Sequence, residues 1–230
     1  MTPFLLVPGL NCDARVYARA AEALWPFGPV TIANHQQGDL MVTIAEAILA
    51  VAPPKFALVG FSMGGYLAFE ILRQAPERVV KLALLDTSAR PDSDEATANR
   101  HRRIALAQAS KMGLVIEQSF PNSVHPENID NSNLYSIHRA MAEANGPKVY
   151  EHQQLAIIAR PDSRPQLGGI KVPTLIVVGE GDQITPPDVA EEMRAGIAGS
   201  RLVVVPKAGH LALLEQPALV NAALKEWAAA

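Results

Sequence analysis

The stretch L-V-G-F-S-M-G-G, Leu58–Gly65, joins an apolar run to a helical pattern through a single serine. The apolar residues Phe56–Val59 predict a buried strand. From Met63 onward, apolar residues recur every three or four positions until Pro76, which predicts a helix that follows without a loop. Ser62 therefore stands at a sharp turn from strand to helix.

Such a turn places special demands on the residues around the serine. Gly60 and Gly64 lie two positions before and two after Ser62, where a side chain would collide across the turn. The start of the helix offers a free N–H and the positive end of a dipole beside the hydroxyl. The pentapeptide alone is a weak signal, but this setting predicts a nucleophile elbow and acyl-transfer chemistry.

Composition limits the classes of protein that need to be considered. The 230 residues fit one domain, and 49% hydrophobic and 19% charged residues are ordinary values for a globular protein. A net charge of −3 gives no reason to expect a nucleic acid or an anionic membrane as partner. Cys12 is the only cysteine, so we expect no internal disulfide and a reducing compartment.

The first residues predict a strand and not a targeting segment. Met1–Val7 lacks basic residues, and its apolar run is too short for a signal peptide. No segment approaches the length of apolar sequence that spans a membrane. We therefore expect a cytoplasmic protein.

Short apolar runs alternate with helical patterns, which predicts a central, mostly parallel sheet of about six strands flanked by helices, that is, an α/β fold. The expected strands are Phe4–Val7, Val30–Ala33, Phe56–Gly60, Val79–Leu85, Thr174–Val178 and Leu202–Val205. The expected helices of this body are Val16–Leu24, Met41–Val51, Met63–Gln74, Asp188–Gly196 and Ala218–Trp227.

The alternation stops between about residues 89 and 169, where helical segments follow one another. We interpret 1–230 as a single domain whose core is 1–88 and 170–230, with 89–169 as a helical cap. Most apolar side chains of the cap are expected to pack it onto the core, and a minority to line a pocket. The basic cluster Arg100–Arg103 is expected to form a solvated face of the cap.

A serine hydroxyl becomes a good nucleophile when an imidazole takes its proton and a carboxylate orients that imidazole. Asp182 and His210 follow Ser62 in the chain, and each comes directly after a predicted strand. The carboxyl ends of parallel strands form the edge where an open α/β sheet builds its sites. Ser62, Asp182 and His210 are thus the candidate catalytic residues.

Three segments together resemble the α/β-hydrolase superfamily over nearly the whole chain: G-F-S-M-G-G, P-T-L-I-V-V-G-E-G-D-Q-I-T-P-P and L-V-V-V-P-K-A-G-H. The chain order Ser, Asp, His is that of this superfamily. The most similar branch is that of capped serine hydrolases, with 3-oxoadipate enol-lactonases, pimeloyl-carrier-protein methyl esterases and small carboxylesterases. The resemblance implies the α/β-hydrolase fold.

The resemblance also implies an oxyanion hole made by the backbone N–H groups of Leu10 and Met63. Two departures from the family pattern are visible. The chain has Pro8-Gly9-Leu10 where the family has a histidine before the glycine, so a hydrogen bond that braces this loop is expected to be missing. The first strand matches the third strand of the family, so two antiparallel strands are expected to be absent.

Other residues compete for these roles. Asp86 ends the fourth predicted strand, where some hydrolases of this fold carry their acid, but the loop around Asp182 matches the family's acid loop better. Cys12 is expected to be a partly buried small residue near the oxyanion loop. Arg139, Arg160 and His152 lie in the cap and are expected to be solvated or ion-paired and not bound to substrate. The histidines show no metal-ligand spacing.

We therefore expect a serine hydrolase that cleaves carboxylic esters or lactones of small molecules through a Ser-His-Asp triad and an acyl-enzyme, without cofactor or metal. Alternatives remain open at this point. The same residues serve thioesterases, C–C hydrolases and perhydrolases, and a ligand-binding receptor can keep the fold without turnover.

Overall fold

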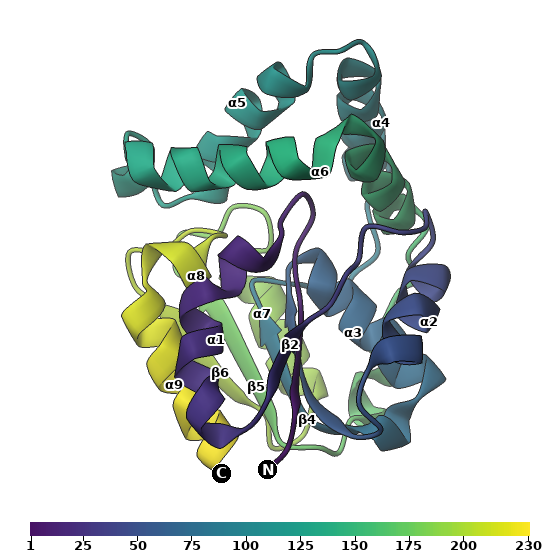
Figure 1. Ribbon diagram of the computed structural model, residues 1–230, viewed down its shortest axis with the longest axis vertical. Helices are drawn as coiled ribbons and strands as arrows, with labels where there is room; N and C mark the ends of the chain where they lie inside the picture. The colour runs from purple at the N-terminus through teal and green to yellow at the C-terminus, as the bar shows by residue number, and fades with distance from the viewer.

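A six-stranded parallel sheet forms the centre of the molecule in the computed structural model, which describes residues 1–230 (Figure 1). The strand order is β2-β1-β3-β4-β5-β6, and every neighbouring pair is parallel. The predicted fold is confirmed, and no antiparallel strand joins the sheet. The strands are β1 (Phe4–Val7), β2 (Val30–Ile32), β3 (Phe56–Phe61), β4 (Val79–Leu85), β5 (Thr174–Gly179) and β6 (Arg201–Val205).

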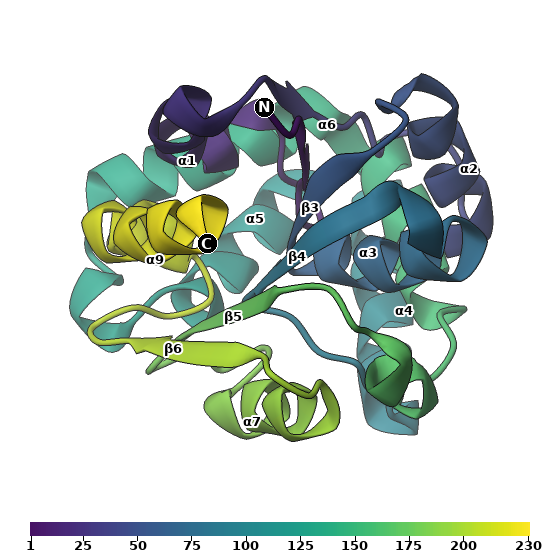
Figure 2. The same cartoon turned by 90° about the horizontal axis from the view of Figure 1, so that it is seen from below.

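Helices cover both faces of this sheet (Figure 2). One face carries α1 (Ala18–Leu24) and α9 (Pro217–Ala229), and the other carries α2 (Met41–Val51), α3 (Met63–Gln74) and α7 (Pro187–Gly196). Short helical turns complete the body: η1 (Ala14–Tyr17), η2 (Trp25–Phe27), η3 (Pro76–Arg78) and α8 (Ala212–Glu215). Both chain ends lie at the end of the body opposite the cap (Figure 1).

Alternation along the central strands divides the core into two clusters, one on each face. On β1, Leu6 belongs to one cluster and Leu5 to the other, and their register partners Val59 and Leu58 follow the same division. Each cluster holds 27 buried residues, so both faces of the central strands are covered, whereas the edge strands β2 and β6 keep exposed residues. The continuous apolar runs that predicted these strands reflect this burial on both sides.

The first predicted helix differs from the structure at its start. Residues from Ala14 to Tyr17 form the 3-10 turn η1, and the α-helix begins only at Ala18. The Asp13 side chain accepts a hydrogen bond from the N–H of Arg15, which caps the tighter turn. Local capping therefore overrides the apolar spacing at this end of the helix.

Between β4 and β5 the chain forms helices only. These are α4 (Asp94–Gln108), α5 (Met112–Ser123), η4 (Pro126–Asn128), α6 (Ser132–Ile158) and η5 (Arg164–Gly169). Helices α4, α5 and α6 lie over the end of the body that faces away from the chain termini (Figure 1). We refer to these three helices as the cap.

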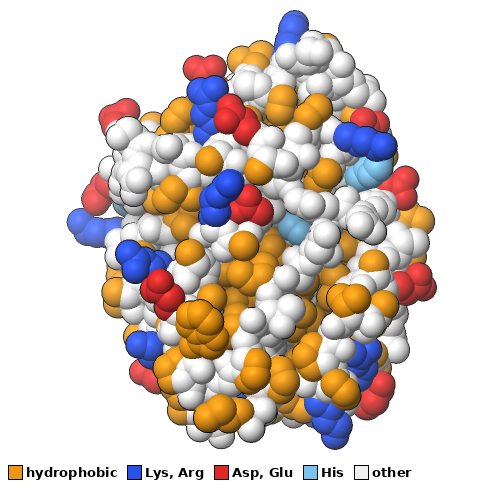
Figure 3. Space-filling model, in the orientation of Figure 1, with side chains coloured by type: hydrophobic (Ala, Val, Ile, Leu, Met, Phe, Trp, Pro, Cys, Tyr) orange, Lys and Arg blue, Asp and Glu red, His pale blue; other side chains and the backbone are white.

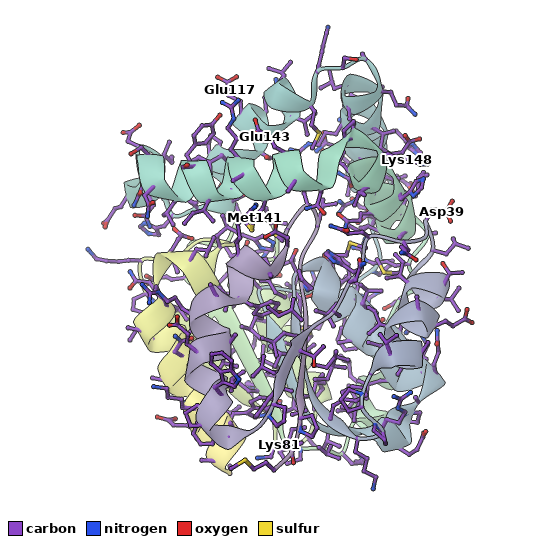
Figure 4. All side chains as sticks on the ribbon, viewed as in Figure 1. Asp39, Lys81, Glu117, Met141, Glu143 and Lys148 are labelled. Atoms are coloured by element: carbon purple, nitrogen blue, oxygen red, sulfur yellow. The ribbon has the colours of Figure 1, made fainter.

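Helix α6 bends in the middle, because Gly146 has φ 74° and is followed by Pro147, which donates no backbone hydrogen bond. Before the bend, Met141 points toward the body and is fully buried, whereas Glu143 lies on the opposite side of the helix (Figure 4). The only separate apolar cluster of the cap consists of Ala107, Val115 and Tyr150. The cap therefore depends on the body for much of its apolar burial.

On the face seen in Figure 3, positive and negative side chains are interspersed, and no large patch of one charge is visible there. None of the helices combines the length and the apolar character needed to cross a lipid bilayer.

Candidate active site

Ser62 lies between the last residue of β3 and the first residue of α3, with φ 51° and ψ −117°. This is a strained backbone conformation for a residue with a side chain. The glycines around it are required sterically: a Cβ on Gly60 would overlap the backbone of Gly64, and a Cβ on Gly64 would overlap the carbonyl oxygen of Val7. The local geometry is the one that the sequence predicts.

His210 links the serine to a carboxylate. Its Nε2 lies 2.8 Å from the Oγ of Ser62, and its Nδ1 lies 2.8 Å from the Oδ2 of Asp182. Asp182 follows β5 and His210 follows β6, so both loops leave the sheet at its carboxyl edge. The structure thus brings the three predicted residues together, and all three side chains are largely buried.

The carboxylate of Asp182 is held by its own loop. Its Oδ1 accepts hydrogen bonds from the N–H groups of Ile184 (2.8 Å) and Thr185 (3.0 Å), and its Oδ2 accepts one from the Thr185 hydroxyl (2.8 Å). Burial alone would raise the pKa of Asp182, but His210 and these donors lower it below its usual range. Asp182 is therefore set up as an anion that faces His210.

Asp86, the alternative acid, has a different environment. It is fully buried at the end of β4, and its Oδ1 accepts a hydrogen bond from the N–H of Gly179 (2.8 Å). Burial, together with repulsion from Asp182, raises the pKa of Asp86 well above its usual range. The structure places no hydrogen bond between Asp86 and His210.

The two predicted oxyanion donors flank Ser62. Leu10 lies in the loop after β1 and lines the same cavity as Ser62, and its N–H has no acceptor within the protein. Met63 is the first residue of α3, where an N–H has no partner one turn earlier in the helix. Both amides are therefore free to receive a negatively charged oxygen.

The loop that carries Leu10 is held by a histidine from another part of the chain than in the family pattern. His35 is buried, and its Nε2 lies 2.9 Å from the carbonyl oxygen of Gly9, to which it donates. Burial lowers the pKa of His35 to about 4, so the ring is neutral at neutral pH. The family's histidine before Gly9 is replaced by Pro8, and His35, which follows β2, braces the loop in its place.

Two cap residues hold the same loop. The Oε1 of Gln153 accepts a hydrogen bond from the N–H of Asn11 (2.8 Å), and the Nδ2 of Asn145 donates to the carbonyl oxygen of Cys12 (3.2 Å). Both amide side chains are buried and lie on α6, on opposite sides of its bend. Sequence reasoning missed them because bonds between residues more than 130 positions apart leave no local pattern.

Cys12 is buried beside the oxyanion loop. Burial raises the pKa of Cys12 to about 12, so the thiol stays protonated. It is more buried than predicted, with 5% of its surface exposed. No group of three His, Cys, Asp or Glu side chains is arranged to hold a metal ion.

A cavity of about 430 Å³ opens at Ser62 between the body and the cap. The body contributes Ser62, His210 and Phe61 among others, and the cap contributes mainly polar groups: Asn99, Arg100, Arg103, Ser119, Asn122, Ser123, His138, Tyr150 and Gln154. Only a few apolar cap residues, Ala96 and Ile157, line the cavity, in agreement with the expectation that a minority do so. The expectation that the whole Arg100–Arg103 cluster is solvated is wrong, because its two end members line the cavity.

The other cap residues considered from sequence lie elsewhere. Arg139 forms an exposed ion pair with Glu143, and Arg160 binds Asp92. Neither these two arginines nor His152 lines the cavity. His138 does line it, and its Nε2 lies 3.1 Å from the hydroxyl of Ser119. Burial lowers the pKa of His138 to about 4, so it too is neutral at neutral pH.

Comparison with known proteins agrees with this architecture. A family model described as "alpha/beta hydrolase fold" matches residues 39–217. The pimeloyl-[acyl-carrier protein] methyl ester esterase of Neisseria meningitidis serogroup B is 27% identical over 206 residues, which cover 84% of this chain and 78% of that protein.

Solved structures show the same fold. A thermophilic esterase from Thermogutta terrifontis, solved with malate bound, is 31% identical, with a TM-score of 0.89 over 99% of this chain and 89% of that one. The enol-lactonase of Burkholderia xenovorans LB400 shares the fold at 21% identity, with a TM-score of 0.87 over 100% of this chain and 92% of that one. The family model covers most of the chain, and the chain belongs to the α/β hydrolase fold family.

Proposed function

We propose that this protein is a serine hydrolase that cleaves carboxylic esters or lactones of small molecules. The observation that carries the proposal is the continuous hydrogen-bonded line from the Oγ of Ser62 through both ring nitrogens of His210 to Asp182, with 2.8 Å at each step. The line ends at a cavity large enough for a small substrate. The esterases among its relatives support the same reaction class.

In the proposed reaction, neutral His210 accepts the Ser62 proton at Nε2 while the hydroxyl oxygen attacks the ester carbonyl. Asp182 holds the proton on Nδ1, so that Nε2 is the nitrogen that faces the serine, and its charge stabilises the imidazolium. His210 then protonates the leaving alcohol, which leaves an acyl group on Ser62. Water, deprotonated by the same nitrogen, releases the acid and restores the hydroxyl.

The tetrahedral intermediate carries its negative charge on the former carbonyl oxygen. The free N–H groups of Leu10 and Met63 are proposed to donate to this oxygen, and the start of α3 adds the positive end of its dipole. Because the loop of Leu10 is held by His35 and Gln153, this donor does not have to be reorganised during the reaction.

The proposal is tested by labelling with a fluorophosphonate and by a panel of p-nitrophenyl esters and lactones. We expect Ser62 to be labelled and Ser62→Ala to lower kcat by several orders of magnitude, because the three residues act as a unit. A Ser62→Ala variant that is folded and keeps most of the parent's esterase activity would overturn the assignment. A labelled Ser62 with no turnover of any ester or lactone would instead favour a receptor of this fold.

A further inference from the structure

The cavity beside Ser62 has an unbalanced charge. No aspartate or glutamate lines it, whereas two arginines of α4, Arg100 and Arg103, do. These positions are three residues apart and so lie on the same side of the helix. An acid-free cavity with two guanidinium groups in its wall favours an anionic occupant.

Arg100 is only partly neutralised. Its Nε lies 2.6 Å from the Oδ2 of Asp92, and its Nη1 donates to the Oε1 of Gln154 at 2.8 Å. The same Asp92 also binds the Nη1 of Arg160 at 2.6 Å. One buried carboxylate therefore faces two guanidinium groups, and a positive charge remains in this wall.

Arg103 has no acidic partner at all. It is partly buried and lies near the hydroxyl of Tyr150. Burial raises the pKa of that phenol, and the charge of Arg103 offsets part of this rise. Every other partly buried arginine is bonded to a carboxylate or to backbone carbonyl oxygens: Arg78, Arg90, Arg100 and Arg160. Arg103 thus stands out as a partly buried cation at a cavity wall without a carboxylate partner.

Neutral hydrogen-bonding groups line the same cavity as this cation. Asn99 lies one turn earlier on α4, and Asn122, at the end of α5, also lines the cavity. A carboxylate is acceptor-only and takes two parallel N–H bonds from a guanidinium fork, with the amide donors available for its remaining lone pairs. The reactive serine lines the same cavity, so an ester that reaches Ser62 also meets this wall.

We propose that the preferred substrates of this protein are esters that carry a free carboxylate on the part of the molecule under α4, where Arg103 pairs with it. The inference rests on the proposed ester hydrolysis and names the substrate class of that site. Arg103 is a specificity-determining residue in this arrangement, and Arg100 supplies the supporting positive charge from its bonded position.

The test compares esters matched in length. For a carboxylate on the acyl side, the pair is the 4-nitrophenyl monoester of glutaric acid and 4-nitrophenyl pentanoate. For the alcohol side, the pair is the butanoate of 4-hydroxybenzoate and phenyl butanoate. We expect kcat/KM for the carboxylated member to exceed that for the neutral member by at least tenfold in one pair, mainly through KM.

Arg103→Gln should lower this ratio about 10- to 100-fold, the range expected for loss of a charge-assisted pair. Arg103→Lys should keep part of it, because the charge remains and the fork is lost. The matched control is Arg102→Gln, which removes the same charge from an exposed neighbouring position outside this cavity and should leave the ratio within about twofold.

Failure of this inference can be told from failure of the proposed function. If neither ester of any pair is hydrolysed in a Ser62-dependent way, the proposed function fails and this inference with it. If neutral esters are hydrolysed through Ser62 and no carboxylated ester is preferred, only this inference is overturned. If Arg103→Gln does not fold, inhibition of the parent protein provides the test. We expect glutarate to inhibit hydrolysis of the neutral ester at least tenfold more strongly than glutaramide does, and equal inhibition overturns the proposal.

Discussion

The body and the cap of this molecule are built in opposite ways. Two clusters of 27 buried residues each lie on the faces of the body's sheet and take in only a few cap residues, and strands β3 and β5 have no exposed residue. The cap has a separate apolar cluster of three residues and presents polar side chains to the cavity. The reactive side chains all come from the body, so we infer that the rigid part carries the chemistry and the polar part selects the substrate.

The largest effect is expected in the body, at the acid. Asp182→Asn should lower kcat by about 10⁴-fold at neutral pH, by analogy with the buried aspartate of serine proteases, because Asn favours the wrong tautomer of His210. Asp86→Asn is the matched control, since it changes a neighbouring buried carboxyl that has no hydrogen bond to His210. It should cost less than about tenfold.

Steady-state kinetics of both variants, at equal folded fraction, check this comparison. If Asp86→Asn inactivates the protein and Asp182→Asn stays active, the acid has been misplaced. The loop after β5 would then have some other role.

A smaller effect is expected at the boundary of the two regions, at His35. Burial lowers its pKa from an ordinary 6.5 to about 4. Between these two pH values His35 is protonated in the unfolded chain and neutral in the folded protein. The resulting loss of folding free energy grows as pH falls and reaches roughly 3 kcal/mol near pH 4. Above pH 6.5 both states are neutral and the loss vanishes.

His35→Gln keeps a donor toward the Gly9 carbonyl and removes the titration. We expect its free energy of unfolding, measured in urea, to fall less than that of the parent between pH 7 and pH 4.5. His101→Gln, at an exposed position on α4, is the control and should follow the parent. Parallel pH curves for the parent and His35→Gln would contradict the burial of a neutral ring.

The smallest effect is expected where the cap reaches into the body, at Gln153. Gln153→Ala leaves the N–H of Asn11 without its acceptor and loosens the loop that carries Leu10. We expect kcat for a neutral ester to fall about tenfold with little change in KM, because the proposed oxyanion donor acts in the transition state. Gln108→Ala, on the exposed side of the cap, should change neither constant. A rise in KM at constant kcat would show that Gln153 serves substrate binding instead.

The same contrast explains what could be predicted from sequence. The central strands are buried on both faces and are therefore continuously apolar. The bounds predicted for all six strands agree with the structure to within one residue at each end. Ser62, Asp182 and His210 were found because the turn glycines and the strand ends fix their positions along the chain. Thr185 sits in the same loop as Asp182, and its hydroxyl could have been anticipated from the motif.

The rest of the site had no local signal. His35 and Gln153 act through single hydrogen bonds to the loop of Leu10, and only the folded chain brings them there. Arg103 looked like part of a solvated basic run, because Arg102 and Arg103 are equivalent in sequence and differ only in the face of α4 that they occupy. In a polar helix, the tertiary packing decides which side chains face a cavity, and the local sequence does not show it.

The short outer strand β2 has a consequence for how this protein behaves at high concentration. Val30–Ile32 pairs with β1 on one side only, which leaves a row of backbone donors and acceptors open on the other. An open row of this kind is a template on which a second polypeptide can add a strand. With three residues the template is too short to hold one, so its brevity guards the sheet against growth into aggregates.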